Sequence, residues 1–401
     1  MIDVVEFIMQ FKFIIVFYLV IIAILYVVRK KLDIQAKIIV LYRMKWGLKW
    51  MDKYSAKFRQ WVILLGYIGT GIGFIGMVVI SFMLIKNVID LIITPNATAG
   101  VALVLPGVNI PGLGVLPFWD WLVAIFFVAI VHEFAHGVVA RAHNIKVKNT
   151  GIVFFGPIIG AFVEPDEKTM RKQSDIVQYS VLAAGAFTNI ILAVIAVALL
   201  TFVTSPLQDT MLEPTGFSFA EYVEGEYPAK AAGLPVATTV TGINGVDVTS
   251  FDEFASELRS SRPGDDIIVT AAERQYTLTL AENPDQTGAS FLGITQIKND
   301  ADMKDAYTSG IGKVGYTILE VLNGKGKGGK GFLFWLYLLS FGIGLFNLLP
   351  LPIVDGGRMA QVFLHRLKGE KKGEKAYHYI GGFFLLILVL SLAVPFLLSL
   401  V

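Results

Sequence analysis

Apolar residues gather in six long runs, near residues 9–28, 61–85, 118–140, 178–204, 332–350 and 378–400. Each run approaches the roughly 20 residues that a helix needs to cross a bilayer. The pattern therefore predicts a polytopic α-helical membrane protein with about six spans. The apolar segment 151–163 is too short, and too often interrupted by glycine and proline, to be a further span. We expect it to form a membrane-embedded β hairpin or re-entrant loop that lies against the protein.

The first run follows acidic residues and lacks an A-x-A-like cleavage site, so it favours a retained anchor over a signal peptide. The loop after it is strongly basic, with Arg29, Lys30, Lys31, Lys37, Arg43, Lys45, Lys49, Lys53, Lys57 and Arg59 against Asp33 and Asp52. Basic loops remain in the cytoplasm, which predicts that residues 141–175 and 365–375 also lie inside. Residues 86–117 and 205–331, and both termini, are then outside.

Residues 207–300 break the apolar pattern. Alternating strand patterns occur at 238–243, 267–272 and 276–280, an Asn244-Gly245 turn follows the first, and 251–259 has the pattern of a short amphipathic helix. These features predict an inserted, strand-rich domain of mixed α and β structure. It separates two parts of a membrane core.

Composition supports a membrane protein, because 55% of the residues are hydrophobic and only 16% are charged. The net charge of +2 gives no indication of nucleic-acid binding. The chain contains no cysteine, which excludes disulfides, thiol catalysis and Cys-zinc sites. A metal ion must therefore be held by His, Asp or Glu.

Within the third run lies His132-Glu133-Phe134-Ala135-His136. Residues four apart share one face of a helix, so His132 and His136 can bind one metal ion while Glu133 activates a water molecule. Ionisable groups within a span are functional by default because they are costly in hydrocarbon. The longer motif HExxHxxGxxH of soluble metzincins is excluded, because Val139 and Ala142 occupy its last two positions.

A third ligand is needed, because catalytic zinc takes three protein ligands and keeps one position open. Asp355 follows the fifth run in the segment Asn347-Leu-Leu-Pro-Leu-Pro-Ile-Val-Asp-Gly-Gly-Arg358. Prolines and glycines can turn the backbone there so that the carboxylate points into the bundle. An Asp that caps the following helix explains the residue equally well. His143, one position too late for the metzincin motif, is expected at the surface.

Together these motifs resemble the site-2 proteases, a family of intramembrane zinc metalloproteases. HExxH, the segment N-x-x-P-x-P-x-x-D-G and the G-x-x-x-N motif Gly185-Ala-Phe-Thr-Asn189 occur as in that family. The resemblance implies one Zn²⁺ ion held by His132, His136 and Asp355, with Glu133 as general base. It makes Asn189 a hydrogen-bond donor in the transition state or a clamp on the substrate strand; a helix-packing site is the alternative for G-x-x-x-N. Val354 stands where the family often has Leu.

The insert resembles a PDZ domain through the segments 227–234, 240–247, 262–265 and 291–294. That resemblance implies capture of an extended peptide, such as a substrate terminus, at a sheet edge; a folded spacer without ligand is the alternative.

We accordingly divide the chain into 1–117 (N-terminal spans and basic loop), 118–206 (catalytic core, first part), 207–300 (PDZ-like domain), 301–370 (catalytic core, second part) and 371–401 (C-terminal span).

The implied function is hydrolysis of peptide bonds within transmembrane segments of single-span substrates that another protease has already trimmed. The reaction is expected in the cell membrane, near its cytoplasmic side. A transporter that uses the His/Glu/Asp cluster as an ion path is the alternative from another class.

Overall fold

The protein is described by a computed structural model that covers residues 4–35, 39–93, 106–107, 109–110, 113–155, 158–325 and 329–398. The chain divides into two compact units. The first consists of Met1–Val197 and Trp335–Val401, and the second of Ala198–Phe334. The second unit is thus an insertion into the chain of the first.

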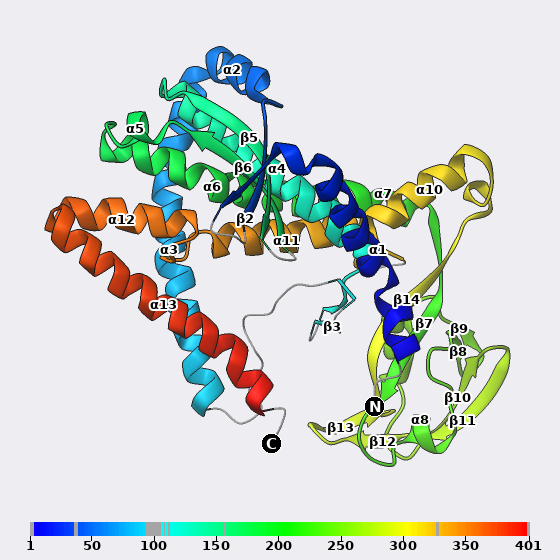
Figure 1. Cartoon of the computed structure of the whole chain (residues 1–401). Coiled ribbons are helices and arrows are strands. Elements are labelled where there is room, and N and C mark those ends of the chain that lie inside the picture. Colours follow the sequence, from blue (N-terminus) through cyan, green and yellow to red (C-terminus); the bar gives the residue numbers. More distant parts are fainter. Residues whose placement is uncertain are drawn as a thin grey trace. The chain divides into compact units, whose positions relative to one another are not determined.

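Long apolar helices dominate the first unit (Figure 1). In the described part of the chain, five helices are long and apolar enough to cross a membrane: α1 (Val4–Val28), α3 (Arg59–Ile93), α4 (Phe118–Ala142), α6 (Asp175–Leu199) and α13 (Glu370–Leu398). They coincide with five of the six predicted runs, although residues 399–400 of the last run lie outside the described residues. The chain is therefore a multi-pass membrane protein.

The fifth apolar run forms a shorter helix than its composition predicts. Helix α11 (Phe332–Phe346) has 15 residues, and α12 (Asp355–Lys368) begins after an irregular segment. Proline lacks an amide hydrogen and clashes with the preceding turn, so Pro350 and Pro352 prevent the helix from continuing. The run therefore ends in a turn that leads directly to Asp355.

A four-stranded antiparallel sheet contains the predicted hairpin. Its order is β1 (Leu32–Gln35), β2 (Ile39–Met44), β5 (Val147–Phe155) and β6 (Ile158–Pro165). The antiparallel pairing of β5 and β6 is confirmed, whereas their position in the membrane stays a prediction, and the turn at 156–157 lies outside the described residues. Strands β1 and β2 come from the segment that we predicted only as a basic loop, because its Lys and Arg residues obscure the strand pattern. Strand β6 forms one edge of this sheet.

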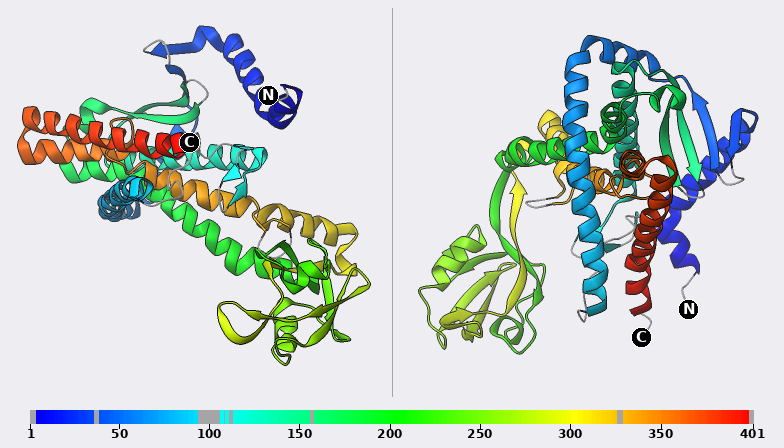
Figure 2. Two further views of the ribbon diagram at one scale, coloured as in Figure 1. Left: turned by 90° about the horizontal axis from the view of Figure 1, so that it is seen from below. Right: turned by 90° about the vertical axis from the view of Figure 1, so that its left-hand side faces the viewer.

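Helix α2 (Leu48–Lys57) also belongs to the segment that we predicted as a loop. Gly47 has φ +81°, a conformation open to glycine, and it turns the chain from β2 into α2. The helix runs across the end of α3, and α3 lies beside α13 (Figure 2). The remaining small elements of the first unit are a 3₁₀ turn (Arg29–Lys31), β3 (Asn109–Ile110), β4 (Gly114–Val115) and α5 (Glu167–Met170).

The second unit is built around a sheet with the order β11-β10-β8-β7-β14, and β9 pairs with β8. Its strands are β7 (Leu212–Tyr222), β8 (Val240–Ile243), β9 (Val246–Asp247), β10 (Asp266–Ala271), β11 (Arg274–Thr279) and β14 (Ile294–Met303); β12 (Ala281–Asn283) and β13 (Gln286–Phe291) form a separate pair. Its helices are a π-helix (Leu200–Thr204), α7 (Ser205–Thr210), α8 (Pro228–Ala231), α9 (Phe251–Leu258), a 3₁₀ turn (Asp305–Tyr307) and α10 (Gly310–Asn323).

The three strand patterns and the short helix predicted in the insert are confirmed as β8, β10, β11 and α9. Strands β7 and β14 are not among the predicted ones. Pro214 and Gly216 interrupt the pattern of β7, and β14 is largely polar, so neither shows clear alternation. Phe217, Phe219, Val269 and Phe254 are buried between the sheet and α9.

Candidate metal centre

Two histidines of α4 face one another across one helical turn. His132 and His136 are 7% and 8% exposed, and their Nε2 atoms lie 3.2 Å apart. This is the arrangement that the i,i+4 spacing predicts. Both imidazoles present the same nitrogen to the same point, as a shared metal ion requires.

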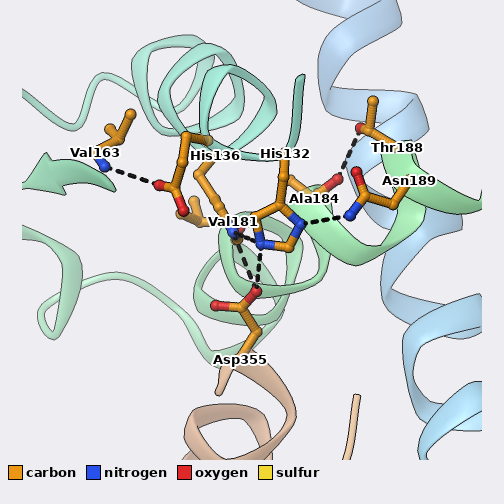
Figure 3. Close-up of polar contacts among 9 residues, drawn as sticks. His132, His136, Val163, Val181, Ala184, Thr188, Asn189 and Asp355 are labelled. Atoms are coloured by element: carbon orange, nitrogen blue, oxygen red, sulfur yellow. Dashed lines mark hydrogen bonds and ion pairs between the residues drawn. The ribbon is translucent and has the colours of Figure 1, made fainter. Parts of the chain in front are cut away.

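Asp355 completes a three-residue cluster. Its Oδ2 atom lies 3.1 Å from Nε2 of His132 and 3.1 Å from Nε2 of His136 (Figure 3). Asp355 is the first residue of α12, whereas Val354 holds the cap position, and no side chain caps this helix. The carboxylate thus points to the histidines, and the alternative in which it caps α12 does not hold.

A tight turn aims Asp355 at the cluster. The amide of Gly356 donates to the carbonyl of Asn347 over 2.7 Å. A Cβ at Gly356 would lie 2.2 Å from the carbonyl oxygen of Leu348, and one at Gly357 would lie 1.7 Å from that of Leu351. Only glycine permits this approach of two backbone segments, which explains the two glycines after the aspartate.

Gly185 of α6 provides the space in front of the histidines. A Cβ at this position would lie 2.4 Å from Nε2 of His136 and 2.5 Å from Nε2 of His132. The first residue of the G-x-x-x-N motif therefore lets α6 pack against the donor atoms themselves. This contact is closer than ordinary packing between small residues.

The donor set fits a zinc ion. Ligands at 2.0–2.1 Å in a tetrahedral arrangement are about 3.3 Å apart, and the three donor atoms here are separated by 3.1, 3.1 and 3.2 Å. Two imidazoles and one carboxylate form a three-ligand set of the kind found in catalytic zinc sites. Among the described residues this is the group of three that could hold a metal ion.

The other ring nitrogens also have partners. Nδ1 of His136 lies 2.7 Å from the carbonyl oxygen of Val181, and Nδ1 of His132 lies 3.1 Å from the side-chain amide of Asn189. A carbonyl oxygen only accepts, so Nδ1 of His136 is the donor and its Nε2 is free for a metal. Asn189 is completely buried on α6. The contact with Val181 has no signal in the sequence, because it involves a backbone atom.

Glu133 connects α4 to the sheet. Its Oε2 atom accepts a hydrogen bond of 2.8 Å from the backbone amide of Val163 in β6. Val163 pairs with Thr150 of β5, yet its amide is directed to the opposite side, toward α4. The sequence could not reveal this link, because any residue except proline offers the same donor.

The remaining histidines lie outside the cluster. Nε2 of His143 is 3.3 Å from the Ser180 hydroxyl, and Nε2 of His365 is 2.7 Å from a carboxylate oxygen of Glu374. His378 contacts the backbone carbonyl of Glu374. His143 is half-buried rather than at the surface, because α6 packs over it.

Comparisons with known proteins identify a peptidase family and zinc metalloproteases that are similar to this chain. The model of peptidase family M50 matches residues 121–388. An uncharacterized protein of Methanocaldococcus jannaschii is 26% identical over 366 residues, which cover 90% of this chain and 87% of that protein. The zinc metalloprotease RasP of Shouchella clausii is 26% identical over 204 residues, or 42% of this chain and 48% of RasP. RasP of Oceanobacillus iheyensis is 23% identical over 252 residues, or 52% and 57%.

The chain thus spans about half the length of these two RasP proteins. A solved PDZ domain from Listeria monocytogenes resembles 20% of the chain and 86% of that domain, at 23% identity and a TM-score of 0.18, which supports no statement about the fold. Because the named relatives are zinc metalloproteases and the donor set fits zinc, the cofactor is Zn²⁺. The match of the M50 model over residues 121–388 shows that this chain belongs to peptidase family M50, the site-2 protease family of zinc metalloproteases.

Proposed function

We propose that the protein is an intramembrane endopeptidase that hydrolyses peptide bonds within transmembrane segments, as in regulated intramembrane proteolysis. One observation carries this proposal. The two histidines and Glu133 belong to a helix that is long and apolar enough to span a membrane, and they meet Asp355 beside β6, the edge strand of a sheet. A proteolytic centre and a surface for an extended chain are therefore adjacent.

His132, His136 and Asp355 hold the metal. When bound, zinc lowers the pKa of a bound water toward about 7 and polarises a carbonyl group. Glu133 acts as the general base. Its Oε2 is engaged by the Val163 amide, which leaves Oε1 to take a proton from the attacking water. The hydroxide oxygen bonds to the peptide carbon, the C–N bond breaks, and the proton passes from Oε1 to the leaving amine.

The edge of β6 receives the substrate as an additional strand. Alternate residues of a strand direct their amides to the same side, so Ala161 shares the outward side of Val163. A helical peptide bond is hidden by its own hydrogen bonds, so a transmembrane substrate must unwind before it is cut. Pairing with β6 stabilises the unwound segment, because its backbone groups regain hydrogen bonds.

Asn189 has two roles in this proposal. If Nε2 of His132 binds zinc, its Nδ1 carries the proton and needs an acceptor, which is the oxygen of the Asn189 amide. Rotation of the Asn189 amide by half a turn exchanges the positions of its oxygen and nitrogen. The position that faces away from His132, now held by Oδ1, has no hydrogen-bond partner among the described residues. With the oxygen toward His132, the NH₂ group is free to stabilise the negative charge that develops on the substrate carbonyl.

The second unit selects substrates as a PDZ-like domain. A cavity of about 460 Å³ lies between α9 and the start of the edge strand β14, and Ala255, Leu258, Leu292 and Ile294 contribute to its walls. This volume suits an extended peptide end. The substrates are single-span proteins that another protease has trimmed. The domain, outside the cytoplasm, binds the new terminus of the trimmed protein.

The basic segments 29–59 and 141–175 support a metal centre near the cytoplasmic side of the membrane. The alternative function, a transporter that uses the His/Glu/Asp cluster as an ion path, is not supported by the match to a peptidase family.

Glu133→Gln tests the proposal. The purified full-length variant should retain zinc at the wild-type stoichiometry, because the three donor atoms are unchanged. Cleavage of a model transmembrane substrate in liposomes should fall by about 10²–10⁴-fold. Retained cleavage would contradict the proposal. If Glu133→Gln also loses zinc, Glu133→Asp serves as the second variant. Its side chain is one methylene shorter, so full activity of Glu133→Asp would also contradict the proposal.

A further inference from the structure

Helix α2 presents three rows of side chains, each at i,i+4 spacing. Met51 and Ser55 are buried against the helices. The next row consists of the aromatic residues Trp50 and Tyr54, which are 57% and 45% exposed. Trp46 lies in the turn before the helix, is 59% exposed, and contacts Trp50 with 5.8 Å between the ring centroids. Beyond it lies a row of exposed lysines, namely Lys49, Lys53 and Lys57, and a fourth exposed lysine, Lys45, precedes the helix. Because residues i and i+1 differ by about 100° around a helix, the aromatic row lies between the buried row and the lysines.

The aromatic row forms one wall of an apolar groove with a volume of about 470 Å³. Helices α3, α4 and α6 form the other walls, and the lining residues described include no charged side chain; examples are Leu65, Phe134 and Phe187. Leu65 is 44% exposed, so the groove opens toward the surroundings of the spans. It lies on the side of α4 that carries Val131 and Ala135, not on the side of the histidines.

Two contacts fix α2 to α4. The Sδ atom of Met51 would be 2.4 Å from a Cβ at Gly137, so the side chain fits into the space that this glycine leaves. Asp52 pairs with Arg141 over 3.1 Å. The four lysines, in contrast, have no carboxylate partner among the described residues. Their positive charge is thus available for an anionic ligand.

We propose that this groove is a binding site for an anionic phospholipid. An acyl chain lies in the groove below Trp46 and Trp50, and the lysine row binds the phosphate headgroup. Trp and Tyr are enriched at the boundary between acyl chains and headgroups, and lysines next to a membrane attract anionic lipids. Charge complementarity and the apolar walls favour this occupant over a segment of substrate. The site is independent of the peptidase chemistry.

Fluorescence quenching tests this proposal without an activity assay. The full chain is placed in nanodiscs that contain equal fractions of phosphatidylglycerol and phosphatidylcholine, of which one or the other is brominated on its acyl chains. The difference between wild type and the double variant W46F/W50F isolates these two of the six tryptophans. We expect a preference for brominated phosphatidylglycerol of at least about five-fold, the factor that one lysine near an anionic surface supplies.

K45Q/K49Q/K53Q/K57Q should remove the preference. The matched control K368Q/K371Q/K372Q/K375Q removes the same charge from another predicted cytoplasmic segment and should retain it. Equal quenching by the two lipids, or a preference that survives the first variant, would overturn the role of the lysines. Protection of both tryptophans from either lipid would show that protein fills the groove and would overturn the site. Should the fourfold variant not fold, K49Q/K53Q gives the same comparison.

Discussion

Gly185 and His132 approach each other so closely that a single methyl group on residue 185 would lie 2.5 Å from Nε2 of the imidazole. This contact joins α6 to the HExxH motif of α4. It gives the glycine of G-x-x-x-N a direct role in the metal centre, because the space that it leaves is the space in front of the donor atoms.

Gly185→Ala should therefore weaken zinc binding. The new Cβ displaces the donor atoms of His132 and His136. We expect zinc affinity to fall by at least about 10–100-fold, the loss that substitutions beside metal ligands typically cause. Zinc affinity can be measured by competition with a chromogenic chelator in detergent. Gly342→Ala is the matched control, because a Cβ at that helical glycine meets nothing within 4 Å. Equal affinities of the two variants would contradict the explanation.

The two roles proposed for Asn189 can be separated. Asn189→Asp keeps an oxygen acceptor for Nδ1 of His132 but lacks the NH₂ group, so zinc affinity should be retained while kcat falls. Asn189→Leu lacks both and should in addition lose zinc affinity by about 10–100-fold. Thr188→Ala is the control, since within the described parts of the chain that hydroxyl donates to the Ala184 carbonyl of its own helix.

If Asn189→Leu binds zinc normally, the amide does not orient His132. If Asn189→Asp retains full kcat, no amide donor acts on the substrate.

Two proline variants distinguish the functions of the β6 edge. Val163→Pro removes the amide that Glu133 accepts and should lower kcat with little change in zinc content. Ala161→Pro removes an outward amide that Glu133 does not use, and should chiefly raise KM if substrates pair with this edge. Steady-state kinetics on a transmembrane substrate in liposomes measure both constants. The same change of kcat and KM in both variants would be evidence against separate roles.

Filling the cavity beside α9 should change substrate choice rather than chemistry. In Ala255→Phe, a phenyl ring occupies the space between α9 and β14. We expect slower cleavage of a trimmed substrate with a free terminus and unchanged cleavage of an unfolded substrate that lacks such an end. Thr277→Phe, on an exposed site of β11 away from this cavity, is the control. A loss of activity toward both substrates would rule out a selective role.

Regular spacing explains which parts of the site could be predicted. The positions of His132 and His136 on one face follow from helix geometry alone. The direction of Asp355 does not follow from any period, because it depends on contacts of Gly356 and Gly357 with the backbone of residues 348–351. Only the order of motifs indicated it as a ligand.

Other features were hidden for different reasons. The lysine and arginine residues in and next to β1, β2 and α2 obscure the hydrophobic patterns of these elements. A segment with so much charge resembles a loop. The aromatic and lysine rows of α2 emerge only when its helical period is known. The link between Glu133 and Val163 involves a backbone amide, and amides are the same in nearly every residue.

The three proposed metal ligands come from parts of the chain that are made at very different times. His132 and Asp355 are 223 residues apart, and all of the second unit is synthesised between them. A nascent chain that ends before residue 355 presents two histidines without the carboxylate that completes the site. Because metal affinity depends on the full set of ligands, we expect stable zinc binding only in chains that include Asp355. A chain that has been made only as far as the second unit therefore lacks one of the three side chains of the metal centre.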